Sequence, residues 1–203
     1  MQPISIKKES PSRISRISRI SRIPRTSRTS RISRKTRKPR KKTNKMKQTT
    51  LCYITQSSSY LMLHRVKKAN DASHDKWIGV GGKCEPDESP DECMLREVKE
   101  ETGLTLTSWQ YRGIVTFISD IWPCEYMHLF TADRWTGTLT SCNEGDLQWI
   151  EKSELFNLTL WPGDRIFLRL IMDPNQPFFS LKLVYQGDDL VSAKLNNTPL
   201  PIT

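Results

Sequence analysis

The sequence predicts an α/β protein in which a mixed β-sheet lies between helices. Two segments carry helical signals: residues 90–102 lie between a helix-start motif and a glycine, and residues 164–172 place apolar side chains at helical spacing. The segments around them are short, rich in β-branched and aromatic residues, and separated by turn residues, which is typical of strands. Because strands and helices alternate, we expect one mixed sheet with helices on its faces.

The strand signals follow one another in a simple order along the chain. Residues 50–55 and 60–65 form a predicted hairpin around the polar turn at residues 56–59. A polar loop, residues 67–76, then leads to the glycine-rich run WIGVGG at residues 77–82, where the backbone can approach a ligand closely. Further strands are predicted at residues 109–119, 125–132 and 147–150, with a closing hairpin at 178–185 and 190–195 around Gly187-Asp188.

The helix at residues 90–102 has signals at both of its ends. Ser89 and Glu92 form a capping box, and Pro90 occupies the first helical position, where its missing N–H costs nothing. Gly103 is placed to end the helix. We therefore predict a helix from Pro90 to Thr102.

Three glutamates of this helix fall on one face. At about 100° per residue, Glu97, Glu100 and Glu101 lie within an arc roughly 100° wide, whereas Met94 and Val98 point toward a core. Close like charges disfavour one another unless a cation neutralises them, and oxygen ligands suit Mg²⁺ or Mn²⁺. Such an ion commonly acts on phosphates. The competing interpretation is a solvated helix face, the usual environment of charged side chains.

Charge divides the 203 residues sharply. Of the 32 Lys and Arg residues, 17 lie in residues 1–45 beside a single acid, Glu9, so this segment has a net charge of +16. The remainder holds 15 basic and 21 acidic residues, a net charge of −6. An acidic body argues against broad electrostatic binding of nucleic acid by the folded domain itself.

Residues 1–45 form a basic leader in which an arginine recurs at every third position from Arg13 to Arg34. This period matches neither a helix nor a strand, and high like charge with little apolar bulk predicts disorder. Three interpretations remain open: a tail that binds nucleic acid or anionic surfaces, an organelle transit peptide, or a misassigned start with the true start near Met46. In each case we expect the folded domain at residues 46–203.

The cysteines and the apolar runs indicate the compartment. Five cysteines, an odd number with no C-x-x-C pair, favour reduced thiols over a disulfide framework or a zinc site. No apolar run approaches the roughly 18 residues needed to cross a bilayer. The sequence therefore predicts a soluble cytoplasmic protein without a membrane partner, in which only the basic leader could bind nucleic acid.

Residues 82–104, GKCEPDESPDECMLREVKEETGL, resemble a complete Nudix box. From about Met46 onward the chain is also similar to the MutT/MutX-type 8-oxo-dGTP diphosphatases, in which runs like KWIGVGGK, CNEG and PFFS lie at comparable places. The resemblance implies an α/β/α sandwich that hydrolyses a nucleoside triphosphate to the monophosphate and pyrophosphate with Mg²⁺, or with Mn²⁺ in its place. It covers nearly the whole acidic part of the chain and none of the leader.

The resemblance also implies roles for individual residues. The metal ligands would be the Gly81 carbonyl, Glu97, Glu100, Glu101 and Glu144. Glu97 is the first choice for the catalytic base, followed by Glu101 and Glu144. Lys83 would lie near the phosphates, Arg96 would organise the carboxylates, and Gly82, Glu88 and Gly103 would be structural parts of the box. Taken alone, Glu144 is typical of a turn, and both cations are typical of a surface.

A second resemblance concerns the nucleobase. The segment Trp161-Pro162-Gly163-Asp164 is similar to the Trp-Pro-Asp-Asp segment of oxidised-purine triphosphatases. Trp161 could stack on the purine and Asp164 could accept hydrogen bonds from its N–H edge, which favours guanine-type bases. Two positions depart from that pattern, because Gly163 replaces the first acid and Ile78 stands where relatives often have a base-reading Asn. The alternative is a Trp that caps the core and an Asp at a helix start.

The leading hypothesis is a Mg²⁺-dependent Nudix pyrophosphohydrolase that removes oxidised purine nucleotides, chiefly 8-oxo-dGTP, from the precursor pool. Two alternatives remain: a Nudix hydrolase of another nucleoside diphosphate derivative, and a non-catalytic nucleotide-binding Nudix module. The complete set of box carboxylates argues against the binding module, because a degenerate sensor need not keep all three glutamates.

Overall fold

The computed structural model describes residues 46–67 and 71–202, so the predicted leader at residues 1–45 lies outside the described part of the chain. The helices are α1 (Pro90–Thr102), α2 (Pro162–Met172) and a short 3-10 helix, Leu155–Asn157. The strands are β1 (Lys47–Gln56), β2 (Ser59–His64), β3 (Trp77–Ile78), β4 (Thr105–Ser119), β5 (Glu125–Thr136), β6 (Asp146–Glu151), β7 (Phe179–Gln186), β8 (Asp189–Leu195) and β9 (Thr198–Leu200).

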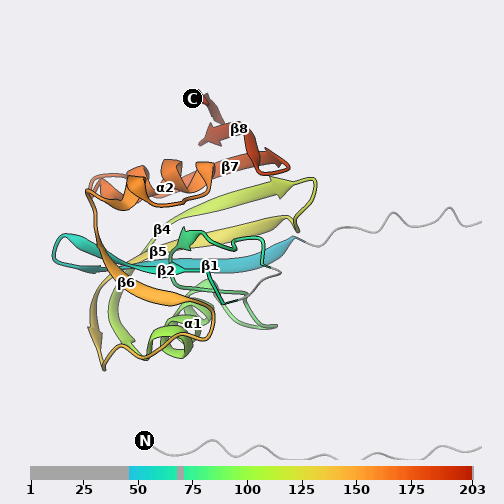
Figure 1. Cartoon of the computed structure of the whole chain (residues 1–203). Coiled ribbons are helices and arrows are strands. Elements are labelled where there is room, and N and C mark those ends of the chain that lie inside the picture. Colours follow the sequence, from blue (N-terminus) through green and yellow to red (C-terminus); the bar gives the residue numbers. More distant parts are fainter. Residues whose placement is uncertain (1–45, 68–70, 203) are drawn as a thin grey trace, which may run out of the picture. The chain divides into compact units, whose positions relative to one another are not determined.

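Within the described residues, nine strands form one mixed sheet. Its order is β3-β2-β1-β5-β4-β7-β8-β9, and β6 pairs with β2. The β1–β5 and β4–β7 pairs are parallel, and the other pairs are antiparallel. Figure 1 shows α1 on one face of the sheet and α2 on the other. The predicted α/β/α sandwich with a mixed central sheet is therefore confirmed.

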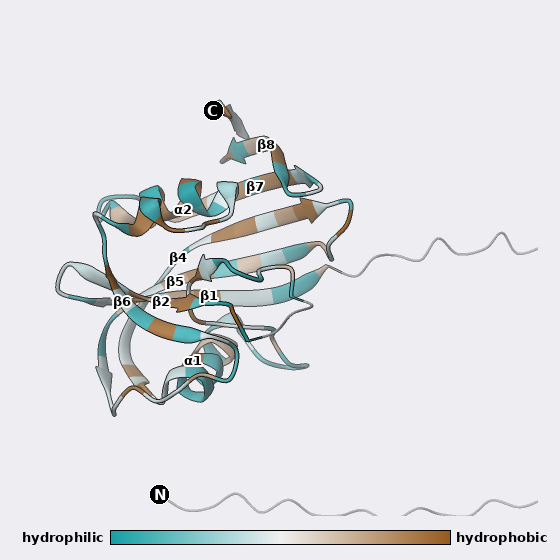
Figure 2. Ribbon diagram, in the orientation of Figure 1, coloured by the Kyte–Doolittle hydropathy of each residue, from teal (hydrophilic) through white to brown (hydrophobic). Residues whose placement is uncertain are grey.

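The central strand β1 contributes to both faces of the sheet. Cys52 and Ile54 are fully buried in the core that includes Met94 and Val98 of α1. Tyr53, between them, is fully buried in the core that includes Phe167 of α2. This alternation follows from the two-residue period of a strand, and each such buried side chain contributes about 1.5–3 kcal/mol. Figure 2 shows polar and apolar residues mixed along α2, as expected of a helix with one face on a core.

Helix α1 has the predicted bounds and the predicted caps. The Ser89 hydroxyl accepts a hydrogen bond from the Glu92 N–H at 3.2 Å, and the Glu92 carboxylate accepts one from the Ser89 N–H at 2.8 Å. Gly103 follows the helix with φ 75°, a left-handed conformation that favours glycine. Met94 and Val98 are fully buried, so the prediction that they point toward a core is confirmed.

The predicted strands are present in the structure, but several of them extend beyond the predicted bounds. β4 begins four residues before the predicted 109, and β5 runs four residues past the predicted 132. These extra residues pair with one another, Thr105 with Thr136, across irregularities in register that no local pattern reveals. The strands β3 and β9 were not predicted, because such short strands depend on distant partners, such as Leu63 for Ile78.

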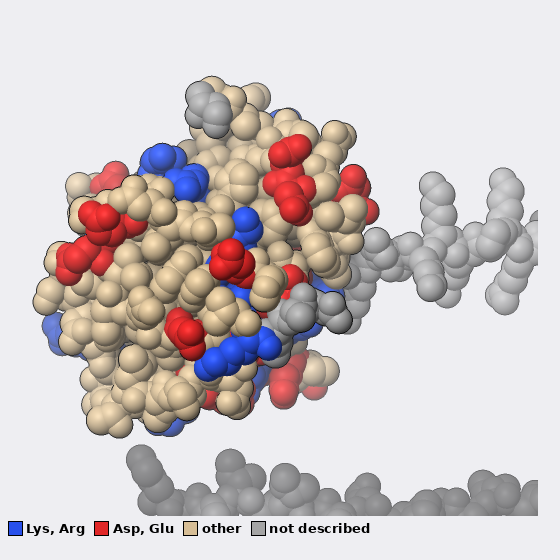
Figure 3. All heavy atoms as spheres, viewed as in Figure 1, with Lys and Arg blue, Asp and Glu red and all other residues tan. Residues whose placement is uncertain are grey.

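None of the helices in the described part of the chain is long and apolar enough to cross a membrane. On the face of the molecule shown in Figure 3, acidic and basic side chains are interspersed over the described part. This face therefore lacks a continuous basic surface of the kind that tracks a nucleic acid backbone.

Candidate functional site

A glycine pair, Gly81-Gly82, lies directly against β1. The Thr50 N–H donates a hydrogen bond to the Gly82 carbonyl at 2.8 Å. Val80 and Cys52 form two backbone hydrogen bonds, in which each N–H donates to the carbonyl of the other residue. A Cβ at Gly81 would collide with the Thr50 carbonyl oxygen. A Cβ at Gly82 would lie 2.5 Å from the carboxyl atoms of Glu97. Both positions therefore need glycine, the first to reach the strand and the second to leave room for a carboxylate.

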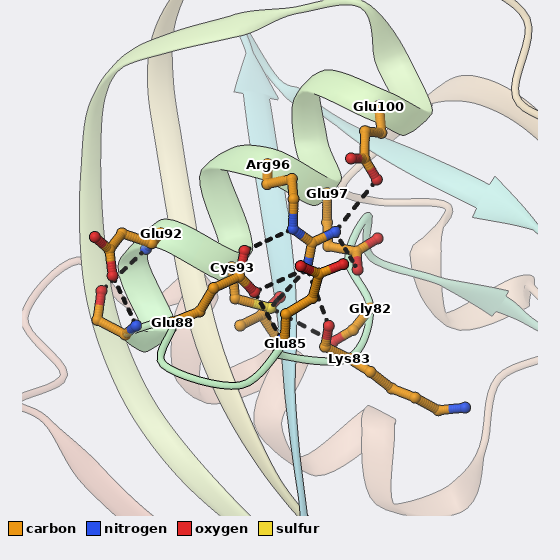
Figure 4. Close-up of polar contacts among 11 residues, drawn as sticks. Gly82, Lys83, Glu85, Glu88, Glu92, Cys93, Arg96, Glu97 and Glu100 are labelled. Atoms are coloured by element: carbon orange, nitrogen blue, oxygen red, sulfur yellow. Dashed lines mark hydrogen bonds and ion pairs between the residues drawn. The ribbon is translucent and has the colours of Figure 1, made fainter.

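Arg96 holds three glutamates of the box together (Figure 4). Its guanidinium donates to both oxygens of Glu88, at 2.6 and 2.9 Å, to Glu97 at 2.9 Å and to Glu100 at 3.2 Å. It also donates to the Lys83 carbonyl at 3.1 Å, which ties the glycine loop to the helix. The hydrogen bonds from Arg96 lower the pKa of Glu88 to about 2. Of the residues predicted to be structural parts of the box, Arg96 and Glu88 are thus in direct contact.

Glu101 lies on the same helix in a different environment. Its side chain is buried, and one oxygen accepts a hydrogen bond from the Gly81 N–H at 3.0 Å. Burial raises the pKa of Glu101 to about 8, the Gly81 N–H opposes the rise, and the charges of Glu144 and Glu97 add to it. At neutral pH this carboxyl is largely protonated unless a cation approaches it.

Arg65 is a site residue that the sequence reasoning missed. Its guanidinium forms ion pairs with Glu144 and with Asp71, the latter including a 2.7 Å bond from Nε. Arg65 directly follows β2 and Glu144 lies two residues before β6, and these two strands pair along their length. The sequence signal for this role was a basic residue, Arg65, at the end of a predicted strand and beside a polar loop. Its partner Glu144 could not be inferred, because it lies 79 residues away in the chain.

The carboxylates supply the oxygen donors that Mg²⁺ and Mn²⁺ prefer. Within the described ranges, however, no group of three or more His, Cys, Asp or Glu side chains is arranged to hold an ion. Arginines account for this arrangement, because Glu97 and Glu100 are turned toward Arg96 and Glu144 toward Arg65. The donor chemistry fits a hard divalent cation, and Glu97 and Glu144 would have to turn from the arginines to share an ion with Glu101.

A pocket of about 230 Å³ lies beside the glycine pair and reaches the start of α2. Its wall includes Gly81, Gly82, Lys83, Trp161 and Asp164. Ile78 and Arg65 also line it. The structure thus brings all four predicted substrate-binding residues, Ile78, Lys83, Trp161 and Asp164, into one pocket, and the box carboxylates adjoin it through the glycines.

The part of this pocket lined by Trp161 and Asp164 differs from a simple helix cap. Trp161 is the residue before α2, its indole N–H donates to the Ser73 hydroxyl at 3.3 Å, and the Lys76 ammonium lies 5.1 Å from its ring centroid. Asp164 is buried, and burial raises its pKa to about 8 although the Lys76 charge opposes the rise. Asp164 thus lies in the first turn of α2, as the alternative interpretation expects, and its carboxyl is also buried in the wall of the pocket.

Known proteins share this fold and these motifs. The NUDIX domain family matches residues 45–171. The uncharacterized Nudix hydrolase YvcI of Bacillus subtilis is 32% identical over 132 residues, which cover 63% of this chain and 80% of that protein. The oxidized purine nucleoside triphosphate hydrolase of Mus musculus is 31% identical over 118 residues, 57% of this chain and 74% of that protein. The crystal structure of a MutT protein from Bacillus halodurans matches with a TM-score of 0.67 and 24% identity, covering 76% of this chain and all of that one.

Proposed function

The chain belongs to the Nudix hydrolase family, and from this premise we propose that it is a Mg²⁺-dependent nucleoside triphosphate pyrophosphohydrolase that acts on 8-oxo-dGTP. The products are the monophosphate and pyrophosphate, and the biological role is the removal of oxidised purines from the nucleotide pool. The similarity to the mouse hydrolase, whose name states its oxidised purine substrate, supports this choice.

One observation carries the proposal: the carboxylates of α1 and the pocket that contains the four predicted substrate-binding residues share the wall formed by Gly81 and Gly82. A triphosphate that enters this pocket can reach the carboxylates at one end. Its base can reach Trp161 and Asp164 at the other end. A non-catalytic binding module needs only the contacts with the base and has no need of the carboxylates.

Nudix hydrolases generally use divalent metal ions, and we assign the ligands to the Gly81 carbonyl, Glu97, Glu100, Glu101 and Glu144. The exposure of the side chains indicates how central each ligand is in the site: Glu100 is 60% exposed, whereas Glu97 is 16% exposed. We therefore place Glu100 at the edge of the site. When bound, the ion supplies charge neutralisation on the phosphates and lowers the pKa of water.

The protein groups share the remaining tasks. Burial raises the pKa of Glu97, which brings its basicity closer to that of a general base at neutral pH. We assign Glu97 the removal of a proton from the attacking water, with Glu101 as the next choice. Arg96 is a positioning residue, because it holds Glu97 while contacting Glu88. Lys83 extends away from the Arg96 cluster, as Figure 4 shows, and we assign it to the phosphates as a point charge.

Base recognition rests on Trp161 and Asp164. Trp161 lines the pocket, and its indole ring provides a surface on which a purine can stack. With a pKa of about 8, the Asp164 carboxyl is largely protonated at neutral pH, so it can donate one hydrogen bond and accept another. This pair of contacts suits a guanine-type edge, which presents both donors and acceptors. Ile78 contributes apolar wall and no hydrogen bond from its side chain.

The test is metal-dependent pyrophosphate release from a panel of nucleotides, with 8-oxo-dGTP beside dGTP, and with ADP-ribose and a nucleotide sugar as the other members. We expect the highest kcat/KM for 8-oxo-dGTP and no release in EDTA. A preference for ADP-ribose or a nucleotide sugar would move the chain to another Nudix specificity. Binding of nucleotides without release from any member would identify a non-catalytic module. The Glu97→Gln variant is the matched control for contaminating hydrolases.

A further inference from the structure

A second pocket, of about 310 Å³, lies at the opposite end of α2. It shares no lining residue with the first pocket, and Ile171 and Met172 at the end of α2 form part of its wall. The rest comes from β4, β5, the β1–β2 hairpin, Lys152 just after β6, and Pro174. We call this the α2 C-terminal pocket. Neither the box nor the proposed base contacts use it.

Arg112 is the first unusual residue of this pocket. It lies at an irregularity in the pairing of β4 with β5, and only 6% of its surface is exposed. One of its five N–H donors reaches the Asp173 carbonyl at 2.8 Å. No carboxylate of the described residues forms an ion pair with it. A buried guanidinium without a counter-ion is costly, so its position requires an explanation.

Lys152 is a second cation in the same wall. Its ammonium lies 4.5 Å from the ring centroid of Tyr60, and partial burial lowers the pKa of the lysine. Among the residues that the structure describes, this ammonium also has no acidic partner within ion-pair distance. The charge of Arg112 reaches the same tyrosine, since it opposes the burial that raises the Tyr60 pKa. The two cations therefore lie near one phenol ring.

The remaining lining is rich in hydrogen-bond donors. Ser108, Thr131 and the Tyr60 phenol supply hydroxyls, and Asp133 is the single acid in the wall. Asp133 and the negative end of the α2 dipole together supply about one and a half negative charges, which the two full positive charges of Arg112 and Lys152 outweigh. The electrostatic balance of the pocket thus favours an anion.

We propose that the α2 C-terminal pocket binds a phosphate-type oxyanion, held by Arg112 and Lys152 with hydroxyl donors around it. The volume lies at the lower end of the range for small-molecule sites, about 300–1,000 Å³, so it suits free phosphate or a small phosphate monoester. The pocket needs no metal, which separates it chemically from the carboxylate site. The proposal does not depend on the proposed hydrolase function.

The test is a titration of the full-length protein with inorganic phosphate and, in a second arm, with AMP, in EDTA so that no metal brings phosphate to the box. Amide ¹⁵N shifts of Gln110 and Thr131 report on the pocket itself. We expect saturable shifts in the wild type and an affinity about tenfold weaker in Lys152→Gln, as for the loss of one strong contact. Tighter binding of AMP would identify a monoester site, and equal or weaker binding a free-phosphate site.

Three further variants locate the binding. Lys182→Gln, an exposed lysine on β7, should bind phosphate as the wild type does. Arg112→Gln should weaken phosphate binding more than Lys152→Gln does. If the substitution of the buried Arg112 impairs folding, Lys152→Gln alone tests the proposal. Equal phosphate affinity in the wild type and Lys152→Gln, or loss of binding in Lys83→Gln with retention in Lys152→Gln, would overturn the proposal.

Discussion

Helices α1 and α2 both present carboxylates to the candidate site, but they hold them in opposite ways. The box glutamates at 88, 97 and 100 all contact Arg96, and Glu101 accepts a backbone N–H. Asp164 at the start of α2 is buried in the wall of a pocket, and the charge of Lys76 only partly opposes the effect of this burial on its pKa. The contacts with Arg96 hold three carboxylates of the box in place for chemistry, whereas burial, as at Glu101, favours the neutral form of Asp164 and keeps it available for recognition.

The largest effect is expected where a box carboxylate is neutralised. Glu101→Gln and Glu97→Gln should each lower kcat by a factor on the order of 10² to 10⁴, the range for removing a general base. Because burial favours the neutral form of Glu101, Gln resembles that form and the fold should be retained. Steady-state kinetics with a thermal unfolding curve checks both parts. Retention of most activity in both variants would refute the carboxylate assignment.

The next effect separates the two helices by pH. The folded-state pKa of Asp164, about 8, lies above its ordinary value of 3.8. The unfolded chain therefore loses this proton first as pH rises, and the stability of the wild type should fall between about pH 4 and pH 8. The Asp164→Asn variant has no carboxyl to ionise, so its stability should not fall in this way. At about 1.4 kcal/mol per pKa unit, its free energy of unfolding at pH 8 should exceed that of the wild type by several kcal/mol.

Urea unfolding at pH 5 and pH 8 measures this difference. The stability gain of Asp164→Asn over the wild type should be larger at pH 8 than at pH 5. Activity on guanine-type substrates should fall in the same variant, because the amide presents a different set of donors and acceptors. A gain that is equal at both pH values would mean that Asp164 is already ionised in the folded protein.

A smaller effect is expected from the stacking residue. Trp161→Leu should weaken nucleotide binding by about 1–3 kcal/mol, the range for removing an aromatic platform beneath a base. The loss should appear mainly in KM, because the carboxylates remain in place. Comparison of 8-oxo-dGTP with inorganic tripolyphosphate provides the control, since a substrate without a base should be insensitive to the change. Equal losses for both would assign Trp161 a structural role.

The smallest effect tests the local character of α1. Ser89→Ala removes the hydroxyl that accepts the Glu92 N–H and should lower the free energy of unfolding by about 1 kcal/mol. The kinetic constants should not change, because Arg96 continues to hold the carboxylates. Chemical denaturation and kcat measured on the same preparation check the prediction. A large loss of activity would show that the cap also positions the site.

The same contrast explains what the sequence could predict. Helix α1 was predicted to the residue, because Ser89, Pro90 and Gly103 act within a few residues of the helix ends. The environment of Asp164 was not predicted, because its burial depends on segments far away in the chain. The ion pair of Arg65 with Glu144 was missed for the same reason. Short edge strands such as β9 were not predicted, because they form by pairing with a neighbouring strand and have no distinctive residue pattern.

The space above Gly82 has a consequence for the history of related chains. Any side chain at this position would occupy the place of the Glu97 carboxyl. Substitution of the glycine should therefore be tolerated only in descendants that have moved or lost the glutamate. A survey of relatives should find that the two positions change together. A chain that retains glutamate at the equivalent of position 97 without the glycine should have lost hydrolysis before it lost the fold.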